Sequence, residues 1–189
     1  MTGDRGTPEP DVRYESYSHE QLKAEVDAGN DPESAGEIAR GWAGLGQRLQ
    51  DAVDALTAAS SGSEEAWQGQ GGEALRAAFA RAGQWAQHAA ETASEVGGGV
   101  AAQAGAAARA RAAMPEPVAY DPAATIRDAV GGGDLAALVG LTDALAERRE
   151  QAERARRQAI DVLYARDRAL RDAVPAGSFT APPSLSSRA

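Results

Sequence analysis

Apolar residues recur along residues 38–59 with the spacing of a long amphipathic helix. Their steps alternate between four and three residues, which is the a/d heptad pattern of helices that pack along a narrow seam. The members of this stripe are Ile38, Trp42, Leu45, Leu49, Ala52, Leu56 and Ala59. Asp31 at the N-cap and Pro32 at the first helical position predict where the helix begins. The serine-rich segment 60–63 predicts where it ends.

A second apolar stripe follows between residues 71 and 113, and it predicts another long helix. Its members are Leu75, Ala78, Ala82, Trp85, Ala89 and Val96, with Phe79 beside them. Three consecutive glycines occupy positions 97–99, and each disfavours a helix by about 1 kcal/mol relative to alanine. We therefore expect a kink or a break there. The Pro-Glu-Pro segment 115–117 ends the helix, because proline cannot continue it.

Shorter elements flank these two helices. Ser18 and Gln21 have the spacing of a capping box, which predicts a helix over residues 18–28. A further short helix is expected over 123–130 and a last long one over 135–174. Proline, glycine, serine and charged residues predict disorder for residues 1–17 and 175–189. The expected organisation is one helical domain over residues 18–174 between two disordered tails.

Composition narrows the fold class. Alanine accounts for 45 of the 189 residues, whereas aromatic residues make up only 5%. Alanine is the best helix former, while strands favour β-branched and aromatic residues. The sequence therefore predicts an all-α fold, in the form of an elongated antiparallel bundle built on a long helical hairpin.

Charge and missing residue types exclude several functions. A net charge of −9 argues against nucleic-acid binding, which needs clustered lysine and arginine. The chain has no cysteine and two histidines, and no catalytic or metal-binding motif has the required spacing. We therefore expect neither an enzyme nor a cofactor or metal site. No apolar run is long enough to span a membrane, and the N-terminus lacks the apolar core of a cleaved signal peptide.

Trp67 and Gly69 form a W-x-G motif between the two stripes. A hairpin of long helices leaves its seam exposed at the turn, where a tryptophan can cover it and offer an aromatic face to a partner. The glycine permits a turn with positive φ or a close helix approach. We interpret the motif as the hairpin turn and Trp67 as an anchor for a partner helix. The accompanying seam residues are Trp42, Leu45, Leu49, Leu56, Phe79 and Trp85.

With these motifs the sequence resembles the WXG100/PPE superfamily of actinobacterial type VII (ESX) secretion substrates, in particular PPE-domain or EspB-like proteins. The resemblance covers about residues 18–179, including both stripes, the W-x-G motif and the proline break. It implies a non-enzymatic protein, secreted or associated with the cell envelope, exported without a cleaved signal peptide. It also implies association with a small WXG- or PE-like helical partner or with itself. The alternative is a cytosolic structural or adaptor bundle with no secretion role.

Two further features bear on export. The family commonly uses a Y-x-x-x-D signal, whereas here Asp167 follows Tyr164 one residue early. This pair is either a degenerate export signal or an ordinary helix pair, with the signal supplied by a partner. Near three glycines at 131–133, three apolar residues form either an exposed tip for a secretion chaperone or ordinary core contacts. These residues are Leu135, Leu138 and Val139.

Overall fold

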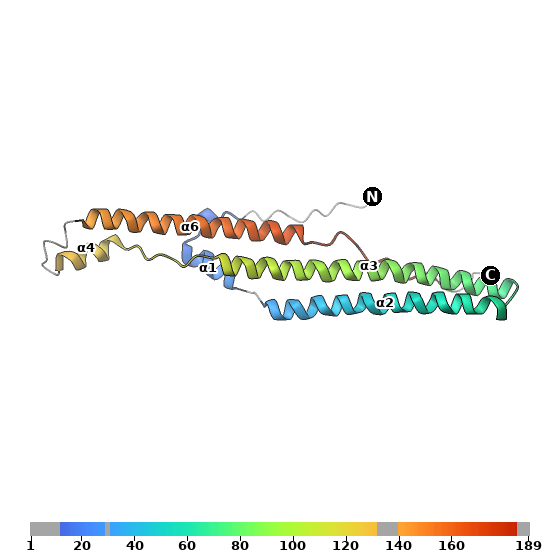
Figure 1. Ribbon diagram of the computed structural model, residues 1–189. Helices are drawn as coiled ribbons and strands as arrows, with labels where there is room; N and C mark the ends of the chain where they lie inside the picture. Colours follow the sequence, from blue (N-terminus) through green and yellow to red (C-terminus); the bar gives the residue numbers. More distant parts are fainter. Residues whose placement is uncertain (1–11, 29–30, 132–139, 185–189) are drawn as a thin grey trace. The chain divides into compact units, whose positions relative to one another are not determined.

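The computed structural model describes residues 12–28, 31–131 and 140–184, and in these ranges it is helical without strands (Figure 1). Its elements are the 3-10 helix η1 (Tyr14–Ser16) and the α-helices α1 (His19–Asp27), α2 (Pro32–Ala66), α3 (Gln70–Ala113), α4 (Pro122–Gly131) and α6 (Leu141–Asp172). The predicted all-α class is confirmed.

The described residues belong to two compact units. We call residues 31–105 and 172–184 the hairpin unit, because it contains α2 and most of α3. We call residues 12–28 and the described part of 106–171 the clasp unit. It contains η1, α1, the end of α3, α4 and nearly all of α6.

Local sequence signals set the helix starts. Ser18 and Gln21 exchange both hydrogen bonds of the capping box, with the Ser18 N–H donating to Gln21 Oε1 at 2.7 Å. Asp31 caps α2 by accepting from the backbone N–H of Ser34 at 3.0 Å, and Pro32 occupies the first turn. Both predicted starts are confirmed, because these interactions satisfy backbone donors that no helical carbonyl can reach.

The end of α2 differs from the prediction. The helix does not stop at the serines of 60–63 but continues to Ala66. Ser63 Oγ donates to the Ser60 carbonyl at 2.7 Å, and the Trp67 N–H donates to the Ser63 carbonyl at 2.9 Å. The predicted end was wrong because serine hydroxyls can also bond back onto the preceding helical turn.

Helix α3 continues without interruption through glycines 97–99, where we expected a kink or a break. A Cβ at Gly97 would lie 3.1 Å from the Ala39 carbonyl oxygen of α2. A Cβ at Gly99 would lie 2.7 Å from the Ala173 carbonyl oxygen, just after α6. These glycines let other backbones approach α3 closely, and that packing offsets their poor helix propensity.

In the hairpin unit, α2 runs antiparallel alongside residues 70–105 of α3 (Figure 1). Its core is made of small residues. The buried alanines of α3 in this unit are Ala86, Ala89, Ala90 and Ala93. A Cβ at the buried Gly46 of α2 would lie 2.8 Å from Ser94 Oγ. Because the two backbones lie this close, large side chains are held at the edges of the pair.

The clasp unit has larger side chains in its core. They come from η1, α1, the end of α3 and α6. The cluster consists of Tyr14, Leu22, Val26, Ala110, Ala159, Ile160 and Leu163. Composition predicts disorder through residue 17, yet Tyr14 is only 2% exposed. Its ring packs edge-on against Tyr164 with centroids 5.0 Å apart, a contact that the polar composition around it does not reveal.

Candidate interaction surface on the α2–α3 hairpin

The apolar stripe of α2 lies at the edge of the hairpin unit rather than in its core. Leu45, Leu49 and Leu56 are each partly buried, and Ile38 is 54% exposed. Although α2 has 35 residues, Gly46 is its only buried one. Covering such a face with a second apolar surface would contribute roughly 25 cal/mol for each Å² removed from water.

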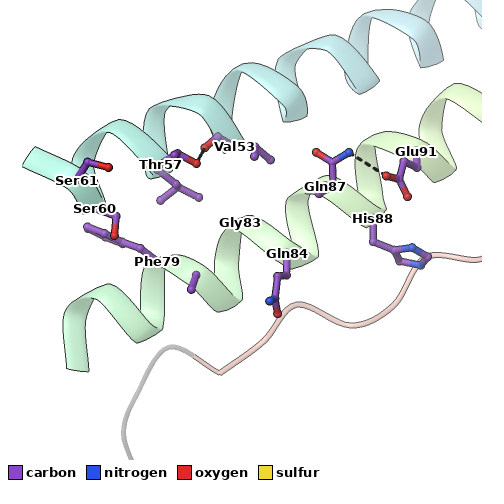
Figure 2. Close-up of a pocket in the computed structure, with 12 residues that line it drawn as sticks. Val53, Thr57, Ser60, Ser61, Phe79, Gly83, Gln84, Gln87, His88 and Glu91 are labelled. Atoms are coloured by element: carbon purple, nitrogen blue, oxygen red, sulfur yellow. Dashed lines mark hydrogen bonds between the residues drawn. The ribbon is translucent and has the colours of Figure 1, made fainter. Parts of the chain in front are cut away.

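A groove of about 570 Å³ lies between α2 and α3 toward the hairpin end (Figure 2). Val53 and Leu56 line it from α2, and Phe79 lines it from α3. The predicted seam residues Leu56 and Phe79 thus share one groove. Farther along α3, Gln87 donates to Glu91 at 2.8 Å. Apolar side chains bordered by polar ones are typical of protein-binding surfaces.

The W-x-G residues lie in the connection between α2 and α3. Trp67 follows α2 directly and is 59% exposed, while Gly69 has a φ of +87° and precedes the first residue of α3. The Trp67 carbonyl accepts a hydrogen bond from Arg76 Nη1 at 3.0 Å. Any side chain at Gly72 would collide with that carbonyl. The backbone of the connection is therefore held in place while the indole of Trp67 remains accessible.

The two seam tryptophans, Trp42 and Trp85, contact the segment that follows α6. The Phe179 ring stacks on Trp42 with centroids 5.7 Å apart and an interplanar angle of 26°. Trp85 Nε1 donates to the Thr180 carbonyl at 2.9 Å. We call residues 173–184 the strap. Composition predicts disorder here and does not indicate these contacts, although Phe179, one of two phenylalanines in the chain, is an isolated apolar signal.

Both residues of the export-signal candidate are bonded to η1. Tyr164 Oη donates to Glu15 Oε2 at 2.9 Å, and Asp167 Oδ2 accepts from Tyr14 Oη at 2.6 Å. Arg166 Nη2 donates to Asp167 Oδ1 at 3.0 Å, and both side chains are nearly buried. Burial and then the bond donated to Asp167 raise the pKa of Tyr14 far above its ordinary value. The bond to Glu15 raises the pKa of Tyr164.

The remaining sequence candidates add little to this surface. The apolar tip at Leu135, Leu138 and Val139 lies outside the described residues, so its role stays a prediction. In the ranges that the structure describes, no group of three or more histidine or acidic residues is placed to hold a metal ion. The helices described there include none with the length and apolarity that crossing a membrane requires.

The fold and the surface together define a class: an all-α protein whose long hairpin carries a half-covered apolar helix face. The PPE family matches residues 14–130, which is more than half of the chain and reaches from η1 to α4. The chain belongs to the PPE family, a family associated with type VII secretion. The resemblance to PPE-domain proteins is thereby confirmed. The sequence has no match among curated proteins.

Proposed function

We propose that this protein is a non-enzymatic substrate of type VII secretion that acts by helix–helix association through the α2–α3 hairpin. The observation that carries the proposal is the half-covered stripe of α2, in which Leu45, Leu49 and Leu56 remain partly exposed. Membership in the PPE family supports the secretion part of the proposal.

The occupant we favour for this face is a small PE-like helical protein, and a second copy of the chain is the other candidate. Two helices of 35 and 44 residues offer a long edge along which a helical partner can pack. A standard interface needs about 800 Å² from each side, which one face of such a hairpin can supply. Heptad spacing of the stripe suits knobs-into-holes packing against another helix.

Trp67 is the proposed anchor at the hairpin end. Its side chain is large, aromatic and accessible, while its backbone is held by Arg76 and by the end of α2. Aromatic residues of this kind are enriched among those that dominate binding energy. An anchor that is already positioned loses little conformational freedom on binding.

The association is tested by site-specific photo-crosslinking in the native host. A photoreactive residue replaces Leu49 on the stripe, and a second version replaces Asp51, which is exposed on the same helix, as the matched control. We expect a crosslinked product from position 49 and little from position 51. Mass spectrometry of the product separates a PE-like protein from a second copy. Equal yields from both positions would contradict the assignment of this face.

Export is tested by fractionation of the same host with and without its type VII ATPase. We expect the protein in the culture filtrate or the envelope fraction of the parent strain, and its loss from those fractions in the ATPase mutant. Retention in the cytosol of both strains would overturn the secretion role and would favour a cytosolic structural or adaptor bundle.

Tyr164 and Asp167 are the proposed degenerate export signal. The substitution Tyr164→Phe keeps the ring that packs on Tyr14 and removes the hydroxyl that donates to Glu15. Reduced export of a folded Tyr164→Phe protein would support a signal role. Unchanged export would leave the pair as an ordinary structural contact between α6 and η1.

A further inference from the structure

The strap covers part of the proposed binding face. Phe179 stacks on Trp42, a member of the α2 stripe, and the Thr180 carbonyl accepts from the indole N–H of Trp85 on α3. Gly177 lies beside Thr92 and Glu95 of α3, so the strap follows that helix. A partner helix that packs along the stripe needs the surface of Trp42 that Phe179 now occupies.

The strap is exposed enough to dissociate from α2 and α3 without unfolding either helix. Residues 176–182 are all exposed, and Phe179 keeps 46% of its surface in solvent despite the stack. The strap carries no charged residue and has three prolines, which limit the conformations open to it when free. Because it is tethered to α6, its effective concentration at the tryptophans is high even though its contact area is small.

The first residues of the strap cross α3 at Gly99, where the absence of a side chain allows a close approach. Gly99 meets the Ala173 carbonyl so closely that a Cβ there would lie 2.7 Å from the oxygen and 3.1 Å from Pro175 Cδ. The neighbouring Gly98 faces open space, because a Cβ at this position would have nothing within 4 Å. Only one of these two adjacent glycines is therefore needed for the strap to dock.

We propose that residues 173–184 act as a removable cover over Trp42 and Trp85, which a partner helix displaces when it binds the hairpin. The competition rests on the proposed function, whereas the docking of the strap does not. Apparent affinity falls in proportion to the fraction of molecules that are open. If the strap is closed in about nine molecules of ten, opening it raises the apparent affinity for the partner roughly tenfold.

The first test compares Gly99→Ala with Gly98→Ala in the full chain. Both substitutions favour the helix to the same degree, but only Gly99→Ala obstructs the strap. The indole N–H signals of the three tryptophans in a nitrogen-15 NMR spectrum are the readout. We expect Gly99→Ala to shift Trp42 and Trp85, to speed solvent exchange of the Trp85 indole proton and to leave Trp67 unchanged. The indole signals and the Trp85 exchange rate of Gly98→Ala should match those of the parent protein.

A second variant removes the aromatic contact of the strap and leaves Gly99 unchanged. Phe179→Ala deletes the ring that stacks on Trp42 and lies outside every helix, so it leaves the hairpin intact. It should speed exchange of the Trp85 indole proton as Gly99→Ala does. The dye 8-anilinonaphthalene sulfonate should fluoresce more strongly with both variants than with Gly98→Ala. Unchanged Trp85 exchange and dye binding in both variants would overturn the cover.

The competition is tested by the crosslink from position 49 in the native host. We expect Gly99→Ala to give a several-fold higher yield of the crosslinked partner than Gly98→Ala. Equal yields, when the NMR spectrum reports an open strap, would overturn the competition. If no variant yields a crosslinked partner, the proposed function and the competition both fail, while the indole result still decides whether the strap docks.

Discussion

The clasp unit and the hairpin unit differ in how the apolar residues of their long helices are covered. In the clasp unit the buried residues of α6, such as Leu163, are covered by the chain itself, because η1 and α1 supply large side chains such as Tyr14 and Leu22 to the same core. In the hairpin unit the two helices meet through alanine and glycine, and the leucines of α2 remain at the edge. The core of the clasp unit is therefore covered by its own chain, whereas the apolar stripe of α2 stays partly exposed.

Because of this difference, leucines of the two units are expected to contribute to different free energies, those of the clasp unit to folding and those of α2 to binding. A buried leucine contributes to the folded state of its own unit, while a half-exposed leucine contributes most when another surface covers it. The aromatic residues divide in the same way. All four tyrosines belong to the clasp unit and all three tryptophans to the hairpin unit. Tryptophan emission therefore follows the hairpin unit alone, and each unit can be observed separately.

The largest expected effect compares one leucine from each unit. Leu163 is fully buried in the clasp unit, so Leu163→Ala should cost about 3 kcal/mol of unfolding free energy. Leu49 is partly exposed, so Leu49→Ala should cost about 1 kcal/mol. Urea unfolding, followed by hydrogen exchange in α6 and by tryptophan emission from the hairpin unit, measures the two costs. Equal costs would show that Leu49 is packed in the hairpin unit as fully as Leu163 is in the clasp unit.

Trp67→Ala should separate binding from folding most cleanly. Because the side chain is 59% exposed, the unfolding free energy of the isolated chain should change by less than about 0.5 kcal/mol. The complex should weaken by about 2 kcal/mol or more if Trp67 is a hot spot. Calorimetric titration with the crosslinked partner, produced separately, measures the loss. Trp67→Phe is the matched control, and an unchanged affinity of Trp67→Ala would remove the anchor role.

The long helices could be predicted from sequence because their signals are local. The stripe from Ile38 to Leu56 and the caps at Ser18 and Asp31 each depend on residues a few positions apart. The glycines at 97–99 show the limit of that reasoning. Their helix propensity predicts a break, but tertiary contacts with Ala39 and Ala173 decide the outcome.

The contacts of the clasp and the strap could not be predicted in this way. Tyr14 meets Asp167 across 153 positions, and Trp85 meets Thr180 across 95. Tyr14 and Thr180 lie in segments whose composition predicts disorder, and each contact depends on a single aromatic residue, Tyr14 in the first and Trp85 in the second. Of the candidate surface, sequence periodicity identified the stripe but not the segment that lies on it.

Alkaline pH should destabilise the clasp unit in particular. The folded state keeps the Tyr14 proton because burial and the bond to Asp167 raise its pKa, with Arg166 opposing them in part. An unfolded tyrosine loses its proton near pH 10. Stability is therefore constant below about pH 9 and falls as the pH rises beyond about 10. Tyr164, whose pKa the bond to Glu15 raises, acts in the same direction.

The substitution Tyr14→Phe tests this dependence. It should cost about 1 kcal/mol at neutral pH, because the hydrogen bond to Asp167 is lost, and it should make the alkaline decline shallower. Urea unfolding between about pH 8 and pH 11, followed by hydrogen exchange in α6, measures both. Tryptophan emission should show no matching decline in the hairpin unit. The same slope in the parent and in Tyr14→Phe would assign the alkaline effect to other groups.

The smallest effect is expected on the outer face of α6. Arg154 Nη1 and Glu150 Oε2 lie 3.1 Å apart, but both side chains are more than half exposed. Water and salt screen such a pair, and its geometry costs side-chain entropy. Glu150→Gln should therefore change the unfolding free energy of the clasp unit by less than about 0.5 kcal/mol. A larger loss in urea unfolding would mean that the charged face of α6, and not the buried clasp, stabilises this unit.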